Sequence, residues 1–224
     1  SQEAVVAAAC RALAEGCRTL GLQAQLILCC MRGAPDAQNA ETLRLAREYL
    51  GKGVCAADLA GAEALFPTRS YAPLFAAVPG LPFTIHAGEA DGPESIRAAL
   101  AMGAKRIGHG VRCIEDAALV AELAQKGIPL EVCPTSNLQT CTFADWAHHP
   151  LKTLLKAGVK VTVNSDNRTV SGTTAQKEMA LAAQHLGLSA AQQARLWLNA
   201  VDAAFLPEAQ KQALRAAVQA RLAG

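Results

Sequence analysis

Apolar residues recur along the chain with two kinds of spacing, which predict helices and strands in alternation. Val5, Ala9, Leu13 and Cys17 lie four residues apart, on one face of an amphipathic helix that covers about the first twenty residues. Beyond this helix, short apolar runs predict six strands, at about 24–31, 53–59, 82–87, 105–109, 129–133 and 159–164.

Helical spacing fills the intervals between these strands and the whole of the chain after the last one. The predicted helices lie at about 37–50, 68–78, 93–102, 115–126, 150–157, 173–186, 189–203 and 207–222. Successive strands begin 23 to 30 residues apart, which is the length of one strand with its following helix. The pattern therefore predicts an α/β fold built from parallel strands.

Two architectures have this repeat: an open doubly wound sheet and an eight-stranded barrel. Neither nucleotide-binding fingerprint, G-x-G-x-x-G or G-x-x-x-x-G-K-[ST], occurs in the sequence, which favours the barrel. Six strands do not close a barrel of eight. We therefore expect residues 1–224 to form one domain, a TIM-type barrel that is N-terminally incomplete, with about six of eight βα units followed by C-terminal helices.

Composition and charge narrow the range of partners. The chain is 51% hydrophobic with a net charge of +2, and it has no run of lysines and arginines, so neither nucleic acid nor a membrane surface is an expected partner. No stretch reaches the roughly 18 uninterrupted apolar residues of a membrane-spanning helix. The eight cysteines form no C-x-x-C pair, and several lie within apolar runs. These features predict a cytoplasmic protein with free thiols.

Polar residues interrupt the apolar pattern mainly where a predicted strand ends. They are Arg32, Asp58, His86 with Glu89, His109, Thr135 to Asn137, and Asn164 with Asp166. In a βα barrel the carboxyl ends of all strands open onto one face, which is where active sites are built. The sequence therefore predicts that residues far apart along the chain share one pocket.

Two histidines and two carboxylates among these residues suit a divalent metal, with zinc as the expected ion. His86, His109 and Asp166 are potential ligands, and Glu89 is the natural proton carrier for a metal-activated water. Each residue taken singly also has an ordinary structural role, in a turn or at a helix end. By the same reasoning His148 and His149 are predicted to lie in a solvated turn. Together, the candidates predict a metal-assisted hydrolase or deaminase, and leave the substrate open.

Six ordered segments resemble the adenosine deaminase family of the bacterial type. They are residues 27–32 (ILCCMR), 58–61 (DLAG), 86–89 (HAGE), 106–110 (RIGHG), 131–137 (EVCPTSN) and 164–167 (NSDN). The resemblance extends over essentially the whole chain. It implies a TIM-type barrel that hydrolyses the 6-amino group of adenosine or deoxyadenosine, a small-molecule substrate, to give inosine or deoxyinosine and ammonia.

The resemblance also implies roles for individual residues. His86 and Asp166 match two protein ligands of the one zinc in each complete active site. Glu89 matches the acid that protonates the purine nitrogen N1, and His109 matches the residue that orients and helps to deprotonate the attacking water. Gly61 matches a backbone donor to N3. Asn167 stands where many members carry an acid that contacts N7, and its amide can donate there without being protonated.

The main departure from the family is the absence of any histidine before His86. The family's His-x-His pair, which supplies two further zinc ligands, has no counterpart in the sequence. We therefore expect these 224 residues alone to hold zinc poorly and show little activity, and to need a separate N-terminal segment to complete the barrel. Two alternatives stay open: an adenine deaminase of the same family, and a non-catalytic barrel fragment.

Overall fold

A computed structural model describes residues 1–223, and these form two compact units. Unit 1 contains residues 1–86 and 98–105, and unit 2 contains residues 87–97 and 106–223. The chain passes from unit 1 to unit 2 within the third of six strands. The strands are β1 (Leu26–Met31), β2 (Val54–Ala60), β3 (Thr84–Ala87), β4 (Arg106–His109), β5 (Pro129–Val132) and β6 (Lys160–Val163). Each strand lies within two residues of its predicted bounds.

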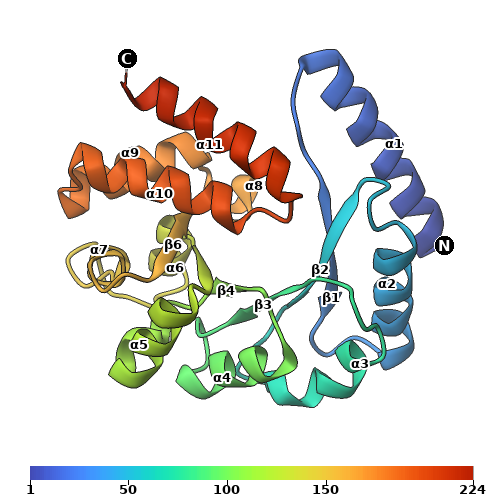
Figure 1. Ribbon diagram of the computed structural model, residues 1–224. Coiled ribbons are helices and arrows are strands. Elements are labelled where there is room, and N and C mark those ends of the chain that lie inside the picture. The colour runs from blue at the N-terminus through green and yellow to red at the C-terminus, as the bar shows by residue number, and fades with distance from the viewer. Residues whose placement is uncertain (224) are drawn as a thin grey trace. The chain divides into compact units, whose positions relative to one another are not determined.

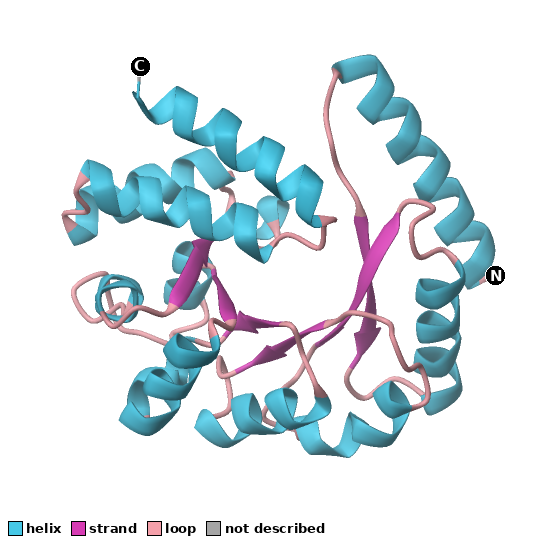
Figure 2. Ribbon diagram, viewed as in Figure 1, coloured by secondary structure: helices cyan, strands magenta, loops and turns pink. Residues whose placement is uncertain are grey.

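The strands form parallel ladders, as the repeat predicts. Strand β1 pairs in parallel with β2 in a two-stranded sheet, with Cys29 opposite Asp58. The other sheet has the order β3-β4-β5-β6, in which β4 pairs in parallel with β5, and β5 with β6 (Figure 2). Because parallel pairing aligns the carboxyl ends of neighbouring strands, polar residues that follow the strands of one sheet lie at one edge.

Eleven helices are described, separated by the strands or by short loops. They are α1 (Gln2–Leu20), α2 (Asp36–Glu48), α3 (Ala72–Ala76), α4 (Pro93–Met102), α5 (Ala117–Lys126), α6 (Pro134–Gln139), α7 (Leu151–Lys156), α8 (Arg168–Ser171), α9 (Ala175–Leu186), α10 (Ala190–Ala203) and α11 (Glu208–Ala223). Two 3-10 turns, Thr68–Tyr71 and Val111–Glu115, precede α3 and α5. No helix among the described residues is long and apolar enough to cross a membrane.

In unit 1, helix α2 packs against both β1 and β2, and α1 packs against α2 (Figure 1). The predicted helix over the first twenty residues is confirmed, but its buried face differs from the predicted one. Val6 and Cys10 are buried, whereas Val5 is 70% exposed. Of the predicted stripe, Ala9, Leu13 and Cys17 are half-buried, so the covered side of α1 includes these residues and extends to Val6 and Cys10.

In unit 2, helix α10 packs against β6, and α11 packs against α10 (Figure 1). A capping box fixes the start of α10, since the Ser189 hydroxyl accepts from the Gln192 backbone N–H and the Gln192 side chain accepts from the Ser189 N–H. Farther along α10, the buried Asn199 donates through Nδ2 to the Val161 carbonyl at 2.9 Å. This bond joins α10 to the backbone of β6 in a place where water cannot replace it.

The loop between α6 and α7 contains the two adjacent histidines, and the prediction of a solvated turn is wrong for one of them. His148 is exposed and pairs with Asp145 at 2.7 Å. His149 is only 4% exposed and its ring lies near those of Phe143 and Trp146. The aromatic residues of the loop enclose His149, an effect that no local pattern predicts.

Burial of His149 predicts a loss of stability in mild acid. Desolvation lowers the pKa of His149 from 6.5 to about 4. Between about pH 6.5 and pH 4 this histidine binds a proton in the unfolded chain but not in the folded chain. The contribution of His149 to the free energy of unfolding therefore falls as the pH decreases through this window. Between pH 7 and pH 5 the loss should be about 2 kcal/mol.

Urea unfolding at the two pH values measures this loss. The His149→Gln variant, which stays neutral, should show a pH dependence smaller by about 2 kcal/mol than the wild type. The His148→Gln variant is the matched control and should retain the wild-type dependence, because His148 is exposed. Equal pH dependence in His149→Gln and the wild type would exclude this role for His149.

Candidate active site

Unit 1 contributes His86 at the end of β3, together with a carboxylate that orients it. Nδ1 of His86 lies 2.9 Å from Oδ2 and 3.1 Å from Oδ1 of Asp58, which is a buried residue of β2. A carboxylate on Nδ1 favours the tautomer in which Nδ1 carries the proton and Nε2 carries the lone pair. This is the arrangement in which a histidine coordinates a metal through Nε2.

Arg32, another residue at a strand end, forms hydrogen bonds to the segments of unit 1 around His86. Its guanidinium donates to the carbonyls of Phe66 and His86, each at 2.7 Å, and to the Thr68 hydroxyl at 2.9 Å. Arg32 is 6% exposed. Since it bonds the backbone of His86 itself, it fixes the position of the strand end from which the imidazole projects.

Unit 2 contains a bonded group of three polar side chains: Glu89, His109 and Asn137. Nδ2 of Asn137 donates to Glu89 Oε1 and lies 3.1 Å from that oxygen and 3.1 Å from His109 Nδ1. On the other side of the ring, His109 Nε2 is 3.5 Å from Glu89 Oε2. The Asn137 amide therefore contacts both of the predicted catalytic residues.

Two glycines allow the segments that carry this group to pack closely, Gly88 against helix α4 and Gly110 against strand β5. Gly88 has φ +76°, and a Cβ there would lie 2.4 Å from Cδ1 of Ile96. Gly110 has φ +66°, and a Cβ there would lie 2.6 Å from Cδ2 of Leu130. A side chain at either position, next to Glu89 or His109, would strain the backbone and displace the buried side chain of Ile96 or Leu130.

Asp166 lies three residues beyond β6 and is held by a neighbouring hydroxyl. The Ser136 hydroxyl donates to Asp166 Oδ2 at 2.7 Å. Asp166 has φ +52° and His109 has φ +57°, and both are non-glycine residues in the left-handed region. Such backbone conformations cost of order 1–3 kcal/mol each and concentrate at functional sites. The structure thus keeps both residues in strained positions that aim their side chains.

A third donor, which sequence reasoning did not select, lies beside these two residues. The ligand atoms of His109, Cys133 and Asp166 all lie within 4.8 Å of one another. Cys133 directly follows β5 and is the N-terminal cap residue of α6. Burial, with added effects of nearby carboxylates such as that of Asp166, raises the pKa of the Cys133 thiol well above its ordinary value. Cys133 lies at a strand end like the other candidates, but without a C-x-x-C pair the sequence did not single out its thiol as a ligand.

Glu178, a fully buried acid in α9, fixes the start of α6. Its carboxylate accepts from the Thr135 backbone N–H at 2.9 Å, from the Thr135 hydroxyl at 2.5 Å and from the Thr173 hydroxyl at 2.6 Å. Helix α6 carries Ser136 and Asn137, so this carboxylate supports both residues that contact the candidate catalytic groups. Nothing in the spacing of the sequence indicates that Glu178 is buried.

The two predicted substrate contacts lie at the ends of β2 and β6. Gly61 follows β2 with φ +110°, and a Cβ there would lie 3.3 Å from the backbone nitrogen of Arg32. Asn167 caps α8, because its Oδ1 accepts from the backbone N–H groups of Thr169 and Val170. The cap occupies Oδ1, so Nδ2 is the part of Asn167 that could donate to a substrate nitrogen.

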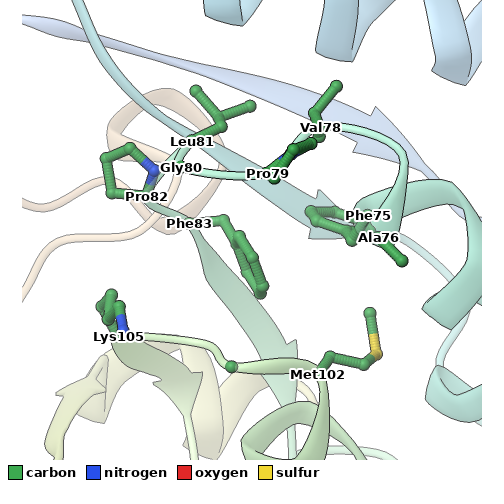
Figure 3. A pocket seen from close by; sticks show the side chains of 11 residues that line it. Phe75, Ala76, Val78, Pro79, Gly80, Leu81, Pro82, Phe83, Met102 and Lys105 are labelled. Atoms are coloured by element: carbon green, nitrogen blue, oxygen red, sulfur yellow. The ribbon is translucent and has the colours of Figure 1, made fainter.

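A separate hollow of about 490 Å³ lies in unit 1, and none of the polar residues described above lines it (Figure 3). Its lining includes Phe75, Pro82 and Phe83, which precede β3, and Met102 and Lys105, which precede β4. The hollow is therefore at the amino ends of these strands. In βα folds the chemistry is at the opposite, carboxyl ends, so this hollow is not the predicted pocket.

Comparison with known proteins relates the chain to one family. A profile described as "Adenosine deaminase" matches residues 1–221. The chain belongs to the adenosine deaminase family. It is 50% identical over 228 residues to adenosine deaminase of Haemophilus ducreyi, covering 99% of this chain and 66% of that protein. It is 43% identical to adenosine deaminase of Escherichia coli, covering 97% of the chain and 66% of that protein. The chain thus spans about two thirds of the length of these relatives.

Solved structures of related enzymes confirm the fold class. Adenine deaminase from Arthrobacter aurescens has a TM-score of 0.88 at 29% identity, over 96% of this chain and 66% of that one. A zinc-bound amidohydrolase from Burkholderia ambifaria has a TM-score of 0.87 at 22% identity, over 94% of this chain and 60% of that one. This member of the adenosine deaminase family therefore has the α/β fold of part of a TIM-type barrel, as the strand repeat predicts.

The potential metal ligands of this adenosine deaminase family member fit a divalent cation such as zinc. The Asp58 carboxylate favours a lone pair on His86 Nε2, and in unit 2 imidazole, thiol and carboxylate donors approach one another within 4.8 Å. Imidazole and carboxylate are ordinary zinc ligands. The structure brings His109 and Asp166 close to one another and Glu89 close to His109. The sharing of one metal by His86 and Asp166 stays a prediction.

Proposed function

We propose that this chain provides most of the active site of a hydrolytic deaminase that converts adenosine or deoxyadenosine to inosine or deoxyinosine and ammonia. Membership of the family and 40–50% identity to proteins named adenosine deaminase support the reaction. The observation that carries the proposal is the bonded group of Glu89, His109 and Asn137, with Asp166 held by Ser136 beside it. This group unites an acid, an imidazole and a potential metal ligand.

The proposed cofactor is one zinc ion per complete active site. His86 and Asp166 would be two of its ligands, and the two further histidines of the family would come from a segment outside these 224 residues. When bound, zinc would lower the pKa of a water molecule and so help it to attack the purine. The orienting contacts of Asp58 with His86 and of Ser136 with Asp166 are of the kind that set the direction of metal ligands.

Glu89 is the proposed acid that donates a proton to N1 of the purine. Its Oε1 accepts a hydrogen bond from Asn137 Nδ2, and its Oε2 lies 3.5 Å from His109 Nε2. Protonation of N1 withdraws electrons from the adjacent C6, the atom that the water attacks. A positioned acid of this kind contributes about 100- to 10,000-fold to a rate.

His109 is the proposed group that orients the attacking water. While Asn137 Nδ2 donates to Nδ1, the proton of the neutral ring is on Nε2, and His109 acts as a hydrogen-bond donor. A turn of the amide would place Oδ1 of Asn137 against Nδ1 and allow the other tautomer. Oδ1 is buried and has no hydrogen-bond partner among the described residues, so the turn would give it one, while Nδ2 would lose its contacts with Glu89 Oε1 and His109 Nδ1.

Gly61 and Asn167 are the proposed contacts of the purine ring. The backbone of Gly61 would donate to N3, and Asn167 Nδ2 would donate to N7, since its Oδ1 caps α8. Neither contact depends on a protonated carboxyl group. Eight free cysteines suit a reducing compartment, so we propose a cytoplasmic enzyme that acts on small molecules.

An adenine deaminase is the second candidate, favoured by the similarity to the solved adenine deaminase from Arthrobacter aurescens. The two candidates differ in whether the substrate carries a ribose. The test compares adenosine with adenine as substrates of the complete zinc-loaded enzyme. Faster formation of inosine and ammonia supports the proposal, whereas faster formation of hypoxanthine from adenine supports the second candidate. Absence of both products would indicate a non-catalytic fragment.

A further inference from the structure

The thiol of Cys133 is the donor of unit 2 to which the proposed reaction assigns no role. Cys133 is 6% exposed, and its sulfur donates to the Glu131 carbonyl at 3.3 Å. It lies within 4.8 Å of donor atoms of both His109 and Asp166. An imidazole, a thiol and a carboxylate that end or follow strands β4, β5 and β6 thus lie close together.

Bound zinc has ligand distances of about 2.0–2.3 Å, so two ligands of one ion lie about 3–4 Å apart. The three donors are therefore within about 1–2 Å of the spacing that a single cation needs. Asp166 is already directed by an outer contact, the Ser136 hydroxyl. For His109, a turn of the Asn137 amide would let Oδ1 accept from Nδ1–H and leave the lone pair on Nε2 for the cation. The left-handed backbone at His109 and Asp166 aims these side chains at a cost in strain.

The chemistry of the three donors selects the cation. Thiolate and imidazole favour borderline and soft ions such as Zn²⁺, Co²⁺ and Cd²⁺ over Mg²⁺ and Ca²⁺, which prefer oxygen ligands. Asp166 is exposed, whereas His109 and Cys133 are buried, so a cation would enter from the side of the carboxylate.

We propose that His109, Cys133 and Asp166 form a three-ligand site for a thiophilic divalent cation, different from the zinc arrangement of the proposed function. Binding breaks the S–H bond of Cys133 and forms a sulfur–metal bond, and the proton leaves to solvent without any change of oxidation state. The charges of thiolate and carboxylate balance the charge of the ion. A cation bound there occupies His109, so it inhibits the deamination proposed above.

Cobalt reports directly on a thiolate ligand. The test adds Co²⁺ to the purified 224-residue chain, stripped of metal and kept reduced with a phosphine. We expect near-ultraviolet sulfur-to-cobalt charge-transfer absorption that saturates at one Co²⁺ per chain, and no competition from Mg²⁺. X-ray absorption of the cobalt-loaded wild type should show one sulfur at about 2.3 Å, by analogy with zinc.

Variants separate Cys133 from the other cysteines. Cys133→Ser should abolish the charge-transfer absorption, and the matched control Cys141→Ser should keep it, because Cys141 is exposed and outside the group. Asp166→Asn should keep the absorption but weaken Co²⁺ binding at least ~10-fold. Circular dichroism checks that each variant folds.

The outcomes decide the proposal independently of the deaminase reaction. No cobalt binding, cobalt bound by nitrogen and oxygen alone, or charge-transfer absorption that persists in Cys133→Ser would each overturn it. The X-ray absorption measurement uses the wild type and therefore holds even if Cys133→Ser does not fold. Adenosine turnover, measured separately, can fail while the cobalt signal appears, and the reverse is equally possible.

Discussion

Replacing Glu89 with glutamine is expected to lower adenosine turnover by the complete zinc-loaded enzyme at least ~100-fold, or by about 3 kcal/mol of transition-state stabilisation. The amide preserves the size of the side chain and can still accept from Asn137 Nδ2, which lies 3.1 Å from Oε1. It has no proton to transfer to N1. Zinc content and nucleoside binding should therefore stay close to wild type, and the loss of turnover should appear as a lower kcat.

The matched control is Glu94→Gln, the same change at an 85% exposed side chain of α4. Its turnover should equal that of the wild type. Steady-state inosine formation and equilibrium binding of adenosine measure the two quantities. If Glu89→Gln turned over at a rate within a few-fold of wild type, Glu89 would not be the acid.

Truncation of Glu178 to alanine is expected to destabilise the fold by about 3–5 kcal/mol. The carboxylate is fully buried and accepts three hydrogen bonds, two from Thr135 and one from Thr173. Alanine removes the acceptor of the half-buried Thr135 and the buried Thr173 and opens a cavity, and both effects lower the free energy of unfolding. Urea unfolding at neutral pH measures the change.

Two further variants separate the loss of the contacts from the loss of a charge. Glu178→Gln retains an oxygen acceptor and should lose less stability than Glu178→Ala. Glu208→Ala removes an acid whose side chain is 65% exposed and should change stability by no more than about 0.5 kcal/mol. An effect of Glu178→Ala as small as that of Glu208→Ala would show that the three bonds contribute little.

Local patterns were sufficient to predict the strands and most of the helices. Apolar runs such as residues 26–31 and 54–60 are long enough to be buried parallel strands, and the intervals between them have room for one helix each. The alignment of polar residues at strand ends follows from parallel pairing alone. This is why Asp58 and His86 in one unit, and Glu89 and His109 in the other, could be selected before any coordinates were known.

Features that depend on contacts between distant segments were not predicted. The sequence indicated polar residues at 135–137 but not helix α6, whose Thr135 is bonded by Glu178, 43 residues farther along the chain. Cys133 has the neighbours of a core residue, and only the three-dimensional arrangement places its sulfur beside Asp166. A solvated turn was expected for His149 because it lies in a polar pair directly before a helix, and the pattern does not show that Phe143 and Trp146 fold over it.

The central claim is that the residues of this chain act in metal-dependent deamination of adenosine. The most direct measurement follows inosine and ammonia from adenosine with the complete enzyme, first as prepared, then after chelation, and then after zinc is restored. The account predicts equimolar inosine and ammonia, loss of both after chelation, and recovery with one zinc per active site. Inosine formation that continued at the same rate in the metal-free enzyme would contradict it.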